Sequence, residues 1–68
     1  MNARKVWFDD LRFFIFLEDG REIAVPLDWI PKLRDATEKQ RQNWCLIGHG
    51  EGIHFEDFDE DILVEALL

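Results

Sequence analysis

The run of residues 11–17 constrains the fold more than any other part of this sequence. Four consecutive residues within it are aromatic or β-branched, namely Phe13, Phe14, Ile15 and Phe16. Such residues favour extended backbone, and apolar side chains on both faces are typical of an interior strand that is covered on at least one side. The sequence therefore predicts a central β-strand over residues 11–17.

The dipeptide Asp19-Gly20 follows this strand and predicts the tight turn of a β-hairpin. Aspartate and glycine both tolerate the positive φ angles that such turns require. After the turn, residues 21–25 resume an apolar alternation in which Ile23 and Val25 share one face. The two segments are therefore expected to form antiparallel strands.

The length of the hairpin loop decides which residues of the two strands face each other. A two-residue turn would pair Phe16 with Ile23, whereas a three-residue loop would pair Ile15 with Ile23. The shorter turn would also set Glu18 opposite Arg21. We predict the two-residue turn, because opposite charges that face each other beside a turn stabilise it by a small amount.

A first helix is expected soon after the hairpin. Pro26 ends the third strand, because proline has no N–H to donate to a sheet. Asp28 then has the position of a cap for a helix over residues 29–35. At helical spacing, Trp29 and Leu33 lie on the same face of that helix.

A second helix is predicted from a capping box. Thr37 and Gln40 stand at the spacing at which each side chain bonds the other's backbone N–H at a helix N-terminus. The helix is expected to run from residue 38 to about residue 46. Trp44 would anchor it to the sheet, and Cys45 would pack inside as a small apolar side chain.

Shorter apolar runs complete the chain. We expect a first strand over residues 5–8 and a fourth over residues 53–55, while residues 62–68 form a terminal strand or a terminal helix, which periodicity does not distinguish. The prediction is one α+β domain over residues 1–68. It contains a small antiparallel sheet built from a three-strand meander, then two short helices, a further strand and the terminal segment.

The charge of the chain limits its partners. Fifteen acidic residues against 8 basic ones give a net charge of −7, which opposes any binding that depends on neutralising phosphates. We therefore expect no direct nucleic-acid binding. The acidity either keeps a small protein soluble or attracts a basic partner. No signal peptide and no membrane-spanning run is visible, and the single Cys45 fits a reducing compartment, so a cytoplasmic protein without membrane contact is expected.

Residues 56–61 form the most distinctive surface that the sequence predicts, and we name them the acidic turn. Five of the six are acidic: Glu56, Asp57, Asp59, Glu60 and Asp61. Their alternation resembles the opening of a calcium loop, but Ile62 stands where that loop requires glycine and Leu68 where it requires an acid. Phe55, Phe58 and Ile62 are expected to tether the turn to the core. Asp59, Glu60 and Asp61 would either cap the terminal segment or meet a basic partner.

No other group of residues has the spacing of a known site. Cys45, His49, Glu51 and His54 fit no compact zinc pattern. The glycines of residues 48–52 follow a predicted helix and lack the lysine of a phosphate loop. The chain contains no serine, and no motif orients a base toward the single cysteine. We therefore predict no catalytic, cofactor-binding or metal-binding residues and a protein that is not an enzyme.

Several short motifs follow one another in an order that resembles one bacterial family, domain of unknown function 2442 (DUF2442). They are Asp19-Gly20-Arg21, Val25-Pro26-Leu27-Asp28-Trp29, Ala36-Thr37, Asn43-Trp44, Gly52-Ile53-His54 and Asp59-Glu60-Asp61-Ile62. The resemblance implies a small α+β domain, which longer members sometimes fuse to a helix-turn-helix domain. It also implies a gene arrangement similar to that of toxin–antitoxin pairs. This sequence has no helix-turn-helix, so DNA binding is not carried over.

From these observations we predict that the chain is a non-enzymatic, antitoxin-like protein-binding module whose acidic turn faces a small basic protein. Trp29 and Leu67 are the residues expected to anchor that partner. The alternative is a homo-oligomeric structural or accessory domain, in which the apolar residues 62–64 and 66–68 pair across a two-fold axis. A metal-binding protein is a third hypothesis, which the spacing of the acidic residues and histidines disfavours.

Overall fold

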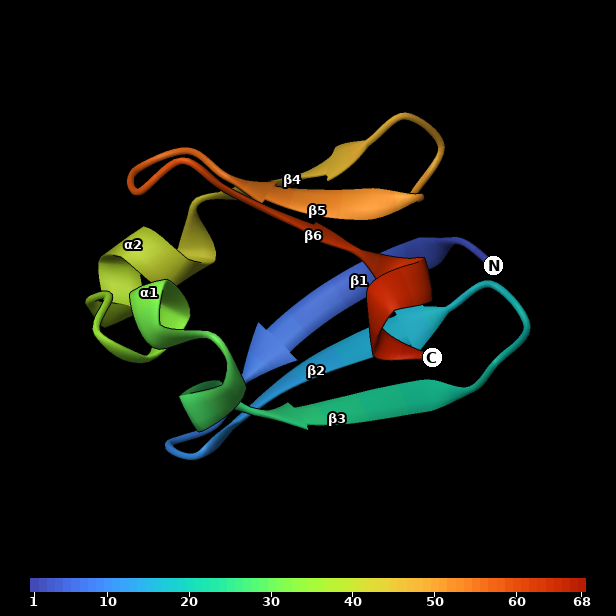
Figure 1. Cartoon of the computed structure of the whole chain (residues 1–68). Helices are drawn as coiled ribbons and strands as arrows, with labels where there is room; N and C mark the ends of the chain where they lie inside the picture. The colour runs from blue at the N-terminus through green and yellow to red at the C-terminus, as the bar shows by residue number, and fades with distance from the viewer.

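The computed structural model describes residues 1–68 and shows two three-stranded antiparallel sheets that face each other across the core (Figure 1). Both sheets are meanders, in which neighbouring strands are also consecutive in the sequence. Sheet A contains β1 (Ala3–Phe8), β2 (Arg12–Leu17) and β3 (Glu22–Pro26). Sheet B contains β4 (Trp44–Ile47), β5 (Gly52–Phe55) and β6 (Glu60–Leu63).

Short helical segments connect the sheets and end the chain. The connection lies at one end of the molecule (Figure 1), and the last helical turn follows β6. In chain order the segments are η1 (Leu27–Trp29), α1 (Pro31–Arg34), α2 (Glu38–Gln42) and η2 (Val64–Leu67). None of them is long and apolar enough to cross a membrane. The predicted α+β class, with its initial meander and two short helices, is confirmed.

The loop of the first hairpin differs from our prediction. Ile15 pairs with Ile23, and Leu17 N–H donates to the Arg21 carbonyl at 2.8 Å, so the loop has three residues. Its last residue, Gly20, has a φ of 91°, as expected for such a loop. This register places Ile15 and Val25 on the inner face, where both are buried. Burial therefore outweighs the single surface charge pair on which the prediction rested.

The first helix is shorter than the predicted range of residues 29–35, because only α1 (Pro31–Arg34) is helical there and η1 (Leu27–Trp29) precedes it as a separate turn. The backbone leaves the helical region at Ile30, with φ −129° and ψ 87°. Ile30 precedes Pro31, whose ring disfavours helical backbone in the residue before it. Trp29 and Leu33 therefore do not share a face, since Leu33 is fully buried and Trp29 is 70% exposed. Asp28 makes no capping hydrogen bond.

The second helix begins where it was predicted and ends earlier. Thr37 Oγ1 accepts from Gln40 N–H at 3.1 Å, and Gln40 Oε1 accepts from Thr37 N–H at 2.9 Å, so the capping box is present. The helix ends at Gln42, and residues 44–47 form β4 instead of continuing the helix. Pairing with β5 overrides local helix preference here, because it lets Trp44 reach the core from a strand.

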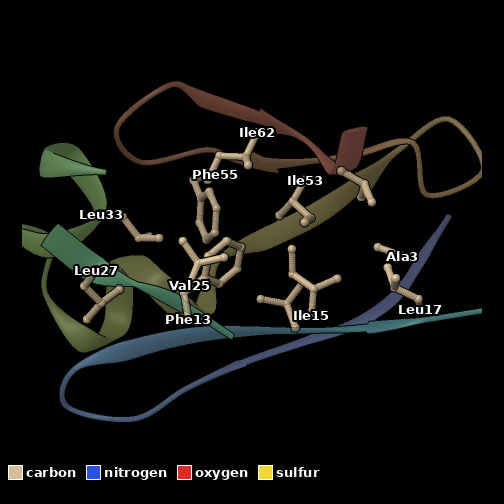
Figure 2. Packing of buried hydrophobic residues seen from close by; sticks show 12 residues of the cluster. Ala3, Phe13, Ile15, Leu17, Val25, Leu27, Leu33, Ile53, Phe55 and Ile62 are labelled. Carbon is tan, nitrogen blue, oxygen red and sulfur yellow. The ribbon is translucent and has the colours of Figure 1, made fainter. Parts of the chain in front are cut away.

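The core fills the space between the two sheets and is entirely apolar (Figure 2). Phe55 of sheet B meets Phe8 and Phe13 of sheet A edge to face, with ring centroids 6.1 Å apart in both pairs. It also stacks on Phe58 at 5.3 Å. The buried residues of this apolar cluster are Ala3, Val6, Phe13, Ile15, Leu17, Val25, Leu27, Leu33, Ile53, Phe55, Ile62 and Val64.

The terminal segment combines both forms that the sequence left open. It continues as strand β6 to Leu63 and then turns into the short helix η2. Ile62 and Val64 are buried in the chain's own core, while Leu63 and Leu68 are exposed. Self-association through this segment would therefore lack two of the side chains on which that hypothesis depends.

Replacing Phe55 with alanine should unfold much of the population at room temperature. Truncating a buried phenylalanine costs about 3–5 kcal/mol, which is a large part of the stability of so small a domain. Phe16→Ala, at a half-exposed ring, is the matched control and should cost clearly less. Urea unfolding followed by circular dichroism measures both. Equal midpoints for the two variants would contradict this account of the core.

Substitutions at two glycines with positive φ distinguish the stability cost of backbone strain from that of steric overlap. Gly20 has a φ of 91° and open space around it, whereas Gly50 has a φ of 107° and accepts a 2.7 Å hydrogen bond from Ala3 N–H. A Cβ on Gly50 would overlap the Ala3 carbonyl, which belongs to the other sheet. Gly20→Ala should cost roughly 1–3 kcal/mol from strain alone. Gly50→Ala should cost more, measured by thermal unfolding, and an equal loss would contradict the overlap.

Candidate functional site

The acidic turn joins β5 to β6 and is held from below by aromatic contacts. Phe58 lies in the turn and stacks on the buried ring of Phe55. Ile62, the inward residue of β6, is also buried. The predicted tethers are therefore confirmed. Asp59 adopts a φ of 49°, which makes it the one residue other than glycine with left-handed backbone and gives the turn its sharp reversal.

His54 is clamped between two carboxylates on the outer face of sheet B. It stands directly opposite Asp61, and its Nδ1 lies 2.5 Å from Asp61 Oδ1. Its Nε2 lies 2.9 Å from Glu56 Oε2. The hydrogen bond to Asp61, and after it the bond to Glu56, raises the pKa of His54 above its ordinary value of 6.5, because both favour the imidazolium. The imidazolium then donates to both carboxylates and ties the turn to β5.

The remaining acidic side chains of the turn divide into paired and unpaired. Glu60 is half-buried, and its carboxylate lies 3.7 Å from Lys32 Nζ of α1. Asp57 and Asp59 are exposed and take part in no ion pair. The carboxylates that remain free to meet a partner are therefore those at the tip of the turn.

Capping of the terminal segment by these acids does not occur. Glu60 and Asp61 belong to strand β6, and the terminal helix begins only at Val64. Leu63 holds its N-cap position and makes no side-chain hydrogen bond. The prediction is wrong because Glu60 and Asp61 lie at the start of β6, and the rest of that strand separates them from the helix end.

The structure places the two expected anchors differently. Trp29 ends η1, and η1 lies at the same end of the molecule as the acidic turn, with the α1 and α2 segment between them (Figure 1). Its side chain is exposed and therefore accessible. Leu67 lies in η2, beyond the opposite end of β6, and packs against the core. The α1 and α2 segment thus separates η1 from the acidic turn, and Leu67 lies beyond the far end of β6.

A row of three chemically active side chains crosses the outer face of sheet B. Cys45 pairs with His54, and His54 pairs with Asp61, so a thiol, an imidazole and a carboxylate stand in line. The order is that of a nucleophile, its base and the group that orients the base. However, His54 Nε2 is bonded to Glu56. No group of three or more His, Cys, Asp or Glu side chains has an arrangement that holds a metal ion.

Sequence reasoning missed this row because it placed Cys45 inside a helix. In the structure Cys45 is exposed on β4. The alternation of residues 44–47 was the available signal, since Trp44 and Leu46 pack against the core while Cys45 points outward. That period of two is typical of a strand with one covered face.

The outer face of sheet A carries a second unexpected surface, the aromatic face, defined by Trp7, Phe14 and Phe16. All three rings are only half-buried. Trp7 and Phe14 stack with centroids 5.5 Å apart and ring planes 6° apart. The guanidinium of Arg12 lies 5.2 Å from the centroid of Phe14. The sequence signals this surface through the second apolar face of residues 11–17, a pattern that also fits an interior strand covered on both sides.

Comparison with known proteins assigns the chain to a family. A family model described as a protein of unknown function (DUF2442) matches residues 3–68. The chain belongs to the DUF2442 family. This confirms the resemblance that its motifs indicated. A comparison with curated proteins gave no match.

A solved structure shares the fold of this DUF2442 chain. It is the crystal structure of a protein of unknown function from Rhodospirillum rubrum ATCC 11170, with 29% sequence identity and a TM-score of 0.82. The similarity covers 97% of this chain and 82% of that one. The arrangement of two small sheets is therefore shared beyond this sequence.

The clamp on His54 predicts a specific pH dependence of stability. Since the folded-state pKa of His54 is raised, its stabilising effect is complete below pH 6.5 and is lost as pH rises through the folded-state pKa. Asp61→Asn removes the largest cause, so the pKa of His54 should fall, and the pH-dependent loss of stability should be smaller and should end at lower pH. NMR titration of the ring, with urea unfolding at each pH, measures both effects.

Asp57→Asn is the matched control for this prediction, because Asp57 makes no bond to His54. It should leave the titration of the ring close to that of the unmodified chain. A pKa of His54 that is the same in the Asp61→Asn variant and in the unmodified chain would contradict the clamp.

Proposed function

We propose that this chain is a non-enzymatic protein-binding module, antitoxin-like in its role, which presents the acidic turn to a small basic protein. One observation carries the proposal: Asp57 and Asp59 stand exposed and unpaired on a turn whose backbone is held in place. Phe58 fixes that turn from below, and the His54 clamp fixes it from the side.

A fixed display of charge favours recognition over mere solubility. Unpaired carboxylates on a flexible loop would lose conformational freedom on binding, which lowers affinity. Here the ordering has already occurred during folding, because the stacked Phe58 and the bonded Asp61 hold both sides of the turn. Negative potential at the tip would then accelerate encounter with a positively charged partner.

Trp29 is the exposed aromatic side chain that is proposed to provide affinity. It is 70% exposed, although a tryptophan gains much free energy from leaving water. Aromatic side chains dominate the binding energy of protein interfaces, while charges at the rim chiefly set the rate of association. Leu67 is not part of the proposed surface, because it packs against the core in η2.

The chemistry of the outer face of sheet B supports a non-enzymatic role. A general base must have a free nitrogen within reach of the proton that it removes. Both ring nitrogens of His54 are instead bonded to carboxylates. The antitoxin-like part of the proposal is supported by the gene arrangement that the family resemblance implies. A basic protein encoded beside this chain is therefore the partner to test.

The test is co-expression with the small protein encoded by the neighbouring gene, followed by size-exclusion chromatography and measurement of association rates. A stable complex is expected, with an association rate that falls as salt is raised. Asp57→Asn with Asp59→Asn should slow association roughly three- to tenfold at low salt and leave dissociation nearly unchanged. Trp29→Ala should instead accelerate dissociation.

Glu65→Gln provides the matched control, since Glu65 is an exposed acid in η2, away from the turn. It should leave both rates unchanged. The absence of a complex with the unmodified chain would overturn the partner. A complex whose association rate ignores both aspartates would overturn the role of the acidic turn.

A further inference from the structure

The side chains on the outer face of sheet A form two rows that run across its three strands. The first row consists of Lys5 on β1, Phe16 on β2 and Glu22 on β3, which stand directly opposite one another. The second row consists of Trp7, Phe14 and Ala24 in the same strand order. Each row thus has an aromatic ring in the middle and two contrasting side chains at its ends.

No other part of the chain covers this face. The core and sheet B lie on the opposite side of sheet A (Figures 1 and 2). The rings of Trp7, Phe14 and Phe16 remain half-exposed. A shallow hollow of about 400 Å³ opens between Lys5, Trp7 and Phe16. Three neighbouring aromatic rings left in contact with water are characteristic of a surface that binds a partner.

We infer that the aromatic face binds the aromatic face of a second copy of this chain. The two-fold axis runs parallel to β2 and between the two facing copies of sheet A, so that β2 of one copy lies over β2 of the other. It then sets β1 of each copy over β3 of the other. This interface is independent of the proposed basic partner, because the acidic turn belongs to sheet B.

Both rows are complementary to themselves under this axis. In the first row, Lys5 of each copy faces Glu22 of the other, so a cation meets an anion twice. Neither residue takes part in an ion pair within its own chain. In the second row, the large Trp7 faces the small Ala24, which is the alternation of volume that lets stacked sheets interdigitate. The hollow beside Trp7 would receive the β3 side of the second copy.

The charge of this face also fits a second copy. The whole chain has a net charge of −7, so two copies repel each other through most of their surface. On this face, one cation at Lys5 and one anion at Glu22 flank Phe16 in the same row. Arg12 and Asp9 already form an ion pair at 3.4 Å. Arg12 lies on β2 and therefore meets Arg12 of the second copy under this axis, and the carboxylate of Asp9 beside each guanidinium offsets part of that repulsion.

The size of the face sets the expected strength of the dimer. Three strands about 4.8 Å apart, with about 3.4 Å per residue along each strand, form a sheet smaller than a standard interface. A weak dimer in the micromolar range is therefore expected. The fraction of dimer depends on protein concentration and should change when the charge of Lys5 or of Glu22 is reversed.

The experiment is sedimentation equilibrium of the full chain from low micromolar to millimolar concentration. The unmodified chain should dimerise over this range. Lys5→Glu and Glu22→Lys each make both cross-copy contacts repulsive, so each variant alone should dimerise about tenfold more weakly or worse. The double variant Lys5→Glu/Glu22→Lys restores opposite charges and should dimerise again.

Mixing the two single variants gives the sharpest result. In a mixed pair, both cross-copy contacts join opposite charges, so a heterodimer should form at concentrations at which each variant alone stays largely monomeric. Circular dichroism verifies that each variant is folded, which is expected because both side chains are exposed. A strict monomer at millimolar concentration would overturn the inference. Equal dimerisation of the mixture of the two variants and of each variant alone would also overturn it. So would a monomeric chain whose aromatic face binds single-stranded DNA.

Discussion

The edge-to-face contact of Phe55 with Phe8 and Phe13 is the interaction on which the rest of this structure depends. Each sheet has only three strands, and neither has another large layer to cover its inner face. Phe55 reaches from sheet B into sheet A, and Phe58 stacks behind it. One ring thereby joins the two sheets and also fixes the base of the acidic turn.

This use of the core leaves three surfaces for other work. The inner face of each sheet is buried in the core. The outer face of sheet A, the outer face of sheet B and the acidic turn therefore remain accessible to partners. They differ in chemistry, since the first is aromatic and balanced in charge, while the turn is acidic. A basic partner at the turn and a second copy at the aromatic face would not compete, because the two surfaces belong to different sheets.

Short sequence motifs correctly predicted those features that depend only on neighbouring residues. Thr37 and Gln40 start α2 because the capping box needs only residues within one turn. The end of that helix was not predictable in the same way, since Trp44 leaves it to pair with Phe55. The hairpin register was decided by which residues the second sheet buries, and a surface charge pair could not reveal that choice.

The sequence by itself determined the α+β class, the first meander, the aromatic tether of the acidic turn and the family motifs, because each follows from neighbouring residues and their period. Only the tertiary structure decided that residues 44–47 are a strand, that His54 is clamped by Asp61 and Glu56, and that one aromatic face of β2 stays uncovered. The physical reason is that strand pairing and burial join residues distant in sequence, whose mutual distance no local pattern encodes.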